Sequence, residues 1–212
     1  MRNFGFTVLA LAAILALAQP ASAQPDGLYF TPKIGYAHMI ADAQMTTAAG
    51  AAYAAVSSSE SYSGNQVALG LAVGYDFKQA YDLPLRVEYE YVWRGKKELV
   101  NNADEKGKLG VQSSFVNAYF DIYNSSPVTP YLGAGLGLAV VSVEYEVPGV
   151  FTYSETKANF AWNIGAGAAW KISDSAALDL GYRYADFGNV GRADIDADVT
   201  AHEVLLGLRY TF

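Results

Sequence analysis

The feature that most constrains the fold is an alternation of apolar and polar side chains with a period of two residues. In residues 85–93 (LRVEYEYVW) every odd position is apolar or aromatic, and most even positions are charged. Residues 178–184 and 203–212 show the same alternation. Successive side chains of a β-strand point to opposite faces of its sheet. These segments are therefore predicted to be strands with one face against an apolar environment and the other against charge.

Five further segments bring the number of predicted strands to eight. They are residues 28–36, 67–77, 114–123, 131–141 and 160–172. Three of them alternate large apolar residues with small ones, which suits a narrow barrel wall that bends or faces a crowded interior. Strands of this length cross a bilayer at a tilt near 45°. The expected fold is an all-β, eight-stranded antiparallel up-and-down transmembrane β-barrel.

The predicted connections alternate between short and long. The short ones are rich in turn-forming Asp, Asn, Ser and Pro and cover residues 78–84, 124–130 and 173–175. The long ones are mostly polar and cover residues 41–64, 95–110, 146–156 and 188–199. Short periplasmic turns and longer extracellular loops are typical of outer-membrane barrels. We therefore expect four extracellular loops.

Residues 1–23 are expected to be a cleaved secretory signal peptide. Arg2 supplies a positive start, residues 4–17 form an apolar run, and Ala21-Ser22-Ala23 is a cleavage site of small residues. The apolar run is too short for a good membrane-spanning helix, so an uncleaved anchor is the weaker alternative. The mature chain then comprises residues 24–212, the size of one domain.

Composition narrows the class of protein further. Of the 14 Lys and Arg residues only Arg2 lies in the leader, so the mature chain has 13 basic against 21 acidic side chains, and its net charge is −8. No nucleic-acid partner is expected from that balance. The chain has no cysteine, so no disulfide stabilises it. After residue 23 no apolar run reaches about 18 residues, which excludes a membrane-spanning helix.

The charged side of the strands is predicted to face the barrel interior. The other side is an almost unbroken apolar and aromatic band, far larger than the exposed patches that soluble monomers tolerate. An eight-stranded barrel has an interior that side chains fill, and unpaired charges there would be costly. We expect a balanced lumen charge network of Lys33, Asp76, Arg86, Glu88, Glu90, Asp121, Lys171, Asp179, Arg183, Glu203 and Arg209. The alternative for these charges is the lining of a conducting pore.

The sequence resembles the OmpA-like and opacity-type small outer-membrane barrels. The resemblance is carried by YLGAGLGL at 131–138, ANFAWNIGAGAAWKISDSAALDLGYRY at 158–184 and LLGLRYTF at 205–212. It implies a barrel in the cell outer membrane, without the periplasmic domain of full-length OmpA because the chain stops at Phe212. The ending is similar to the family's assembly signal. That likeness implies recognition by the barrel-insertion machinery of Leu206, Leu208, Tyr210 and Phe212.

Residues for catalysis or metal binding are scarce. The chain has two histidines and lacks a GxSxG nucleophile turn and an HExxH pair, so no enzyme activity, catalytic residue or cofactor is expected. His38 and His202 are predicted to meet at the outer rim when the first and last strands pair. A metal there would need Asp42 or Glu203 as a further ligand. Contact with lipopolysaccharide phosphates, or simple packing, is the preferred interpretation, and no metal site is expected.

Two functions fit this architecture. The first is a structural or surface-interaction role, as in adhesins and antigens, with contacts carried by the extracellular loops. The loop residues expected to meet a host or other extracellular ligand are Lys96, Lys97, Asp104, Asp194, Asp196 and Asp198. The alternative is a narrow porin for small solutes or ions. Outer-membrane lipid and lipopolysaccharide are the expected surroundings in both cases.

Overall fold

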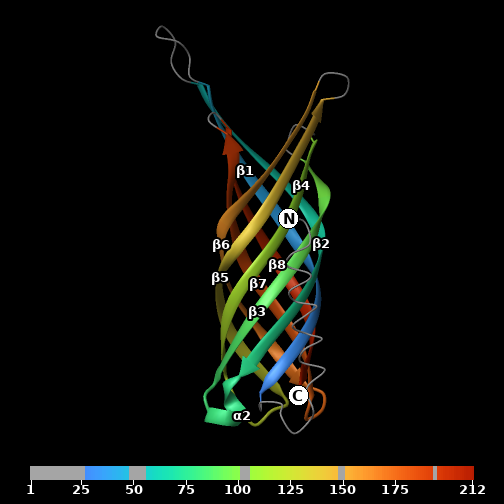
Figure 1. Cartoon of the computed structure of the whole chain (residues 1–212), viewed down its shortest axis with the longest axis vertical. Coiled ribbons are helices and arrows are strands. Elements are labelled where there is room, and N and C mark those ends of the chain that lie inside the picture. The colour runs from blue at the N-terminus through green and yellow to red at the C-terminus, as the bar shows by residue number, and fades with distance from the viewer. Residues whose placement is uncertain (1–26, 48–55, 101–105, 148–150, 193–194) are drawn as a thin grey trace.

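The chain folds into a closed antiparallel barrel of eight strands (Figure 1). The computed structural model describes residues 27–47, 56–100, 106–147, 151–192 and 195–212. The strands are β1 (Leu28–Thr47), β2 (Val56–Asp76), β3 (Leu85–Val100), β4 (Lys106–Asp121), β5 (Val128–Val147), β6 (Phe151–Lys171), β7 (Ala176–Arg192) and β8 (Ile195–Thr211). Each strand pairs with its neighbours in sequence, and β1 pairs with β8. The predicted fold class is confirmed. The predicted signal peptide lies outside the described residues and stays a prediction.

The pairing register shows that the strands are steeply tilted. We start at His38 on β1 and step to the paired residue on each next strand, from β8 round the barrel to β2. The path returns to β1 at Leu28, ten residues from His38. That displacement of ten residues is the stagger that closure of the sheet demands, and it requires strands tilted strongly from the barrel axis. β1 and β8 close the barrel at their lower ends, where the backbone N–H of Phe212 donates to the carbonyl of Leu28 at 2.9 Å.

Side-chain exposure follows the predicted alternation along the membrane-facing part of the wall. Outward residues such as Leu136 and Ile164 are more than half exposed, whereas Glu90 and Glu203 are completely buried inside. On β6 the outward aromatic residues Trp162 and Phe160 lie near one end of this band and Trp170 lies near the other. The ten residue steps from Phe160 to Trp170 span roughly 23 Å along the barrel axis when strands tilt near 45°, which matches the apolar band of outer-membrane barrels.

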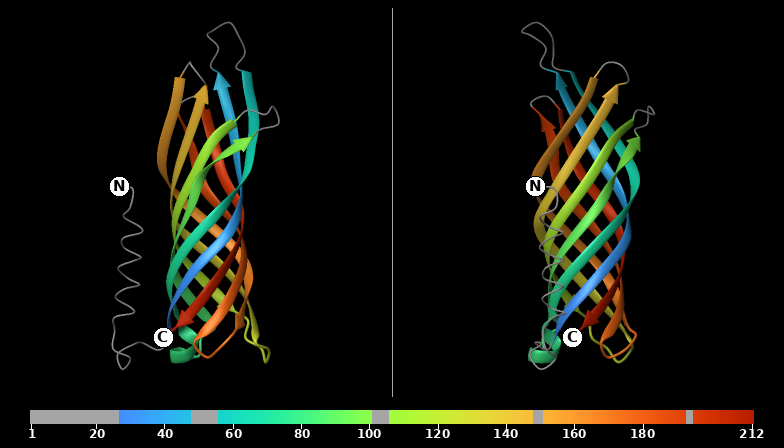
Figure 2. Two further views of the ribbon diagram at one scale, coloured as in Figure 1. Left: turned by 90° about the vertical axis from the view of Figure 1, so that its right-hand side faces the viewer. Right: turned by 45° about the vertical axis from the view of Figure 1, so that its right-hand side comes forward.

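The strands run well beyond this band, which corrects the expectation of four long loops. β2 and β6 each have 21 residues. At the end of the barrel predicted to be extracellular, the four pairs of strands leave only residues 48–55, 101–105, 148–150 and 193–194 between them. Figure 2 shows the β1–β2 and β5–β6 hairpins projecting furthest at this end. A strand that has left the lipid no longer needs an apolar outer face, so its sequence loses the alternation that marks the membrane part.

The part of the strands above the band is here called the extension. The pairing there is interrupted at two seams, which divide the wall of the closed barrel into two groups of four strands, called its two sheets below. The β6–β7 ladder reaches only Trp162 and Asp186 within the described residues. The β2–β3 register shifts between Ser63 and Ala68, and pairing resumes at Ser63 and Val100. β7, β8, β1 and β2 therefore form one sheet, and β3, β4, β5 and β6 form the other. At the β6–β7 seam Gly188 adopts a positive φ of 70°, which a side chain would strain.

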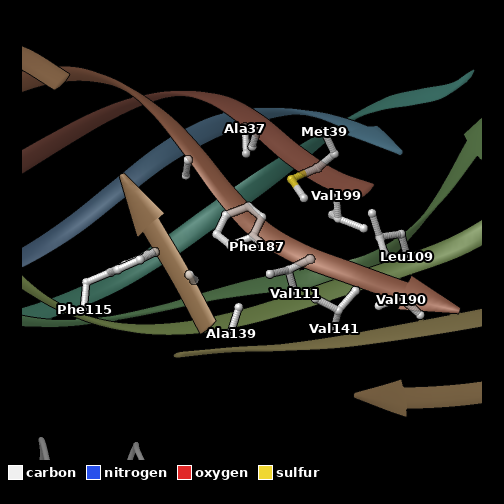
Figure 3. Close-up of a cluster of buried hydrophobic side chains, with 13 residues drawn as sticks. Ala37, Met39, Leu109, Val111, Phe115, Ala139, Val141, Phe187, Val190 and Val199 are labelled. Atoms are coloured by element: carbon white, nitrogen blue, oxygen red, sulfur yellow. The ribbon is translucent and has the colours of Figure 1, made fainter. Parts of the chain in front are cut away.

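An apolar core fills the space between these two sheets (Figure 3). Met39, Phe187 and Val199 contribute to it from one sheet, and Val111 and Val141 contribute from the other. All are buried. The interior of the extension is thus packed like a β-sandwich. Leu109, Val190 and Val199 of this core fall in segments that were predicted to be loops.

The periplasmic turn between β2 and β3 contains a short helix, α2 (Phe77–Tyr81), where a plain turn was expected. The Asp76 side chain accepts a hydrogen bond from the backbone N–H of Lys78 at 2.9 Å and so caps the helix. Asp82 ends it in the left-handed conformation, with φ of 56°. In the part of the chain that the structure describes, no helix is long and apolar enough to cross a membrane.

The close approach of β4 and β5 makes a prediction about Gly137. A Cβ atom there would lie 1.9 Å from the carbonyl oxygen of Ser114 on β4, so Gly137→Ala should force the backbones apart and cost about 1 to 3 kcal/mol. The measurement is urea unfolding in lipid vesicles. Gly70→Ala is the matched control, because its Cβ would come no closer than 3.2 Å, to the Val92 side chain. Equal stability of the two variants would contradict the packing described here.

Candidate functional site

The lumen below the extension, called the lower lumen, holds a continuous chain of alternating charges. In order it runs Glu88, Lys33, Glu90, Arg183, Glu203 and Arg94, and it is called the ion-pair chain below. Four strands supply it, β1, β3, β7 and β8, because inward positions of each face the barrel axis. Every member is buried except Lys33, whose side chain is 10% exposed. The chain thus ties distant strands together across the interior.

The distances within the ion-pair chain are those of charge-assisted hydrogen bonds. Lys33 Nζ lies 2.5 Å from Glu88 Oε1 and 2.6 Å from Glu90 Oε2. Arg183 donates to Glu90 at 2.5 Å and to Glu203 at 2.7 Å. Arg94 donates to both oxygens of Glu203, at 2.5 and 2.9 Å, and to the Ser113 hydroxyl at 3.0 Å. Such short, multidentate contacts offset part of the cost of burying the charges.

Two further pairs lie towards the periplasmic end. Arg86 contacts both carboxylate oxygens of Asp121 at 2.7 and 2.8 Å, and its guanidinium also lies 4.9 Å above the Tyr119 ring. Arg209 and Asp179 form a looser pair at 3.5 Å. Each cation of the lower lumen therefore faces a carboxylate, and aromatic rings cover part of the guanidinium surface.

Two of the expected lumen charges lie outside this network, which corrects the sequence-based assignment. Asp76 lies at the end of β2 and caps α2. Lys171 lies at the end of β6, is 61% exposed and pairs with Asp174 in the adjoining turn. This contact holds the pKa of Asp174 below its ordinary value. Both positions have the inward parity, but they lie where the wall ends and water is available.

Arg94, the last member of the ion-pair chain, was not among the predicted lumen charges. Arg94 has the same parity as Glu88 and Glu90 on β3, so continuing the alternation one residue past Trp93 would have found it. Uncharged polar residues of the lumen were also missed. They include Tyr29, which donates to Glu88 at 3.3 Å, and Asn163, which donates to Asn117 at 2.9 Å.

A cavity of about 50 Å³ lies beside the ion-pair chain in the lower lumen. Its lining includes Lys33, Arg86, Glu90 and Arg183. Buried polar atoms without a protein partner in the described chain include Asp179 Oδ1 and Nη atoms of Arg183 and Arg209. The volume and these atoms suit a few water molecules. Above the cavity, the completely buried Arg94 and Glu203 and then the apolar core occupy the barrel axis.

The expected loop-contact residues fall into two groups. Lys96, Lys97 and Asp198 are exposed on strands of the extension, not on loops, and Lys96 forms an ion pair with Glu144 on β5. The remaining three, Asp104, Asp194 and the side chain of Asp196, lie outside the described residues.

His38 and His202 are direct cross-strand partners, as predicted. Their predicted position at the outer rim is wrong, because the β1–β8 ladder continues to Met45 and Ile195 and the pair lies on the wall below the extension. Their ring nitrogens contact Asn65 and Tyr182. Among the described residues no three or more His, Asp or Glu side chains gather in a metal-binding arrangement.

The comparison with known proteins decides the family. Residues 7–212 match the family model described as the outer membrane protein beta-barrel domain. The chain belongs to this family. It is also 29% identical over 246 residues to the outer membrane protein PagN of Salmonella typhimurium, and the match covers 100% of both chains. The protein is therefore an integral β-barrel protein of the cell outer membrane.

Solved outer-membrane barrels share the fold. The chain is similar to Neisserial surface protein A, with a TM-score of 0.54 and 23% identity over 86% of this chain and 97% of that one. It is similar to the outer membrane protein OprG from Pseudomonas aeruginosa, with a TM-score of 0.57 and 16% identity over 88% of this chain and 97% of that one. These likenesses support the OmpA-like and opacity-type resemblance at the level of the fold.

In this outer-membrane barrel three residues of the expected assembly signal, Leu206, Leu208 and Tyr210, lie on the last strand and face lipid. Leu206, Leu208 and Tyr210 are 41%, 49% and 49% exposed on the outer wall of β8. Phe212 follows the strand, and its ring lies 5.3 Å from that of Tyr210 in an edge-to-face contact. They form an apolar outward column at the end of the chain.

Glu203 provides the test of the ion-pair chain, because it bridges two arginines. Glu203→Gln should leave Arg94 without a carboxylate and lower the free energy of unfolding by about 3 kcal/mol. The measurement is urea unfolding in lipid vesicles. In a double-mutant cycle, adding Arg94→Met should recover most of the loss, because no uncompensated charge then remains. Lys171→Gln, at the exposed pair, is the control and should have no measurable effect. An equal loss of unfolding free energy in Glu203→Gln, in the double variant and in Lys171→Gln would contradict the pairing.

Proposed function

We propose that this outer-membrane barrel is a surface-interaction protein whose extracellular strand extension carries the contacts. The observation that supports this most directly is the extension itself. It holds the outward polar residues Asp42, Lys96 and Lys108 on paired strands beyond the lipid-facing band. A surface fixed on paired strands loses less conformational freedom on binding than a loop does. The apolar core between the two sheets keeps that surface rigid.

The interior gives little support to the porin alternative. A solute moving along the axis would have to pass the ion-pair chain, where Arg94 and Glu203 are completely buried, and then Phe115 and Phe187, which are also completely buried. The two rings lie 6.5 Å apart, centroid to centroid. Opening a path would break buried ion pairs and an apolar core together. We therefore favour the non-conducting role.

A non-enzymatic role is part of the same proposal. His38 and His202, the two histidines of the chain, contact an amide and a phenol rather than a serine or a carboxylate. Buried carboxylates of the lumen such as Glu90 and Glu203 are engaged by Lys or Arg, so they are poor general acids or bases.

We further propose three classes of partner. Outer-membrane lipid, with lipopolysaccharide in the outer leaflet, covers the apolar band. The outward column Leu206, Leu208, Tyr210 and Phe212 is the surface that the barrel-insertion machinery would recognise, in keeping with the resemblance in sequence. The extension would meet a host or other extracellular ligand.

The first test of the proposal is conductance. We expect the refolded protein to insert into planar lipid bilayers without stable channel steps, because the lumen is blocked at two levels. Insertion is checked independently by the altered gel migration of the unboiled sample. Reproducible steps of uniform size from the wild-type protein would favour the porin alternative.

The second test removes parts of the extension without disturbing the register. Ala41 and Tyr62 are cross-strand partners, so an Asn-Gly turn joining them deletes the tip of the β1–β2 hairpin. Ser142 and Thr156 are partners on β5 and β6 and permit the same change there. Both variants should still fold as heat-modifiable barrels. Binding of bacteria expressing the protein to host cells or matrix should fall with one or both deletions. Unchanged binding with both hairpins shortened would contradict the proposal.

A further inference from the structure

His38 and His202 form an imidazole pair on the lipid-facing wall. Along its strand each is flanked by two inward side chains with no exposed surface, so the alternation directs both imidazoles outward. The register makes them direct partners on β1 and β8, and Cβ atoms of such partners lie about 5 Å apart. The two rings therefore share one small patch of the wall.

The pair lies at the boundary between the lipid-facing band and the extension. One outward row nearer the periplasm, Tyr36 and Val204 are about half exposed and belong to the apolar band. Two outward rows above the histidines, Asp42 and Asp198 are exposed cross-strand partners in the extension. A residue at this height, outside the barrel, meets the headgroup layer of the outer leaflet. The two carboxylates are four residues away along their strands, so they do not contact the imidazoles.

Both imidazoles are held in place by a hydrogen bond at Nδ1. His38 Nδ1 lies 2.7 Å from Asn65 Oδ1, and Asn65 is its cross-strand partner on β2. The Tyr182 hydroxyl lies 2.7 Å from His202 Nδ1, and the Tyr182 ring stacks on His202 with centroids 6.1 Å apart. The Tyr184 ring contacts His202 edge-on at 5.4 Å. In the described chain both Nε2 atoms have no hydrogen-bond partner.

The two partners set which nitrogen can donate. An amide oxygen only accepts, so His38 Nδ1 carries a proton and donates to Asn65. When the Tyr182 hydroxyl donates to His202 Nδ1, the ring proton of His202 lies on Nε2. In that tautomer His202 presents an Nε2–H donor to the headgroup layer, and His38 presents its Nε2 beside it. The residues packed around the pair, Asn65, Tyr182 and Tyr184, carry no charge. The carboxylate of Asp186 lies one outward row above on β7, beside Thr200, and it accepts a hydrogen bond from the backbone N–H of Gly188.

We propose that His38, His202, Asn65 and Tyr182 form a docking site for a phosphate group of an outer-leaflet lipid. Phosphate offers several acceptor oxygens, and hydrogen bonds from imidazole to an oxyanion are strengthened by charge. The lipid A part of lipopolysaccharide carries phosphates at this depth of the membrane, and it is the occupant to which the position of the patch points. The site is independent of whatever the extension binds, so it can be tested separately.

The test uses the fact that the chain has two histidines. Untagged, folded protein labelled with ¹⁵N at histidine gives ring signals from these two side chains alone. In detergent micelles, phosphorylated lipid A should shift both sets of ring signals, whereas lipid A stripped of phosphate and inorganic phosphate at equal concentration should not. A shift with the stripped lipid would show contact with sugar or acyl chain and overturn the phosphate assignment. An equal shift with inorganic phosphate would overturn the assignment to a lipid.

Affinity for phosphorylated lipid A provides the second measurement. The double variant His38→Phe with His202→Phe should bind about tenfold more weakly, equivalent to about 1.4 kcal/mol. Thr200→Val is the matched control, since it removes an outward polar group from β8 two residues from His202, and it should bind like the wild type. Heat-modifiable migration verifies that both variants fold. Wild-type affinity in the double variant would overturn the proposal.

Discussion

In hydrocarbon, every backbone N–H and C=O needs a partner within the protein, and the closed ladder from β1 to β8 supplies those partners. Closure with a stagger of ten residues fixes which side chains point inward, and it leaves an interior that side chains must fill. The charges gathered there are paired because lipid surrounds the wall and a lone buried charge is costly. The ion-pair chain is therefore a consequence of closing a small barrel in lipid.

The sequence predicted the membrane half well, because lipid outside and charge inside produce a strict alternation there. It identified Glu88, Glu90, Arg183 and Glu203 as inward, and the structure pairs all four. The prediction was wrong where the contrast between lipid outside and charge inside ends. Asp76 and Lys171 have the inward parity but lie at the ends of strands, in reach of water, and Arg94 lies one residue beyond the segment that alternates clearly. The individual partners depend on register, which no local pattern encodes.

The strands of the extension were predicted as loops for a related reason. Above the lipid the outer face meets water, so the polar residues move outside and apolar residues such as Met39 and Val111 move inside. The alternation keeps its period but reverses its polarity, and small or polar residues such as Ser61 and Ser142 blur it. A segment of this kind resembles a loop when it is compared with the lipid-facing strands, although it has the pattern of a soluble β-sandwich.

Arg94 lies where the two halves of the lumen meet. Below, its guanidinium binds Glu203 through two hydrogen bonds. Above, the same group lies 4.7 Å over the ring of Phe187 in the apolar core. This one side chain, which is completely buried, thus ends the charged half and begins the apolar half. Because the axis is occupied on both sides of this residue, the surfaces that remain for contact with other molecules are the outer wall, where His38 and His202 meet the headgroup layer, and the extension above it.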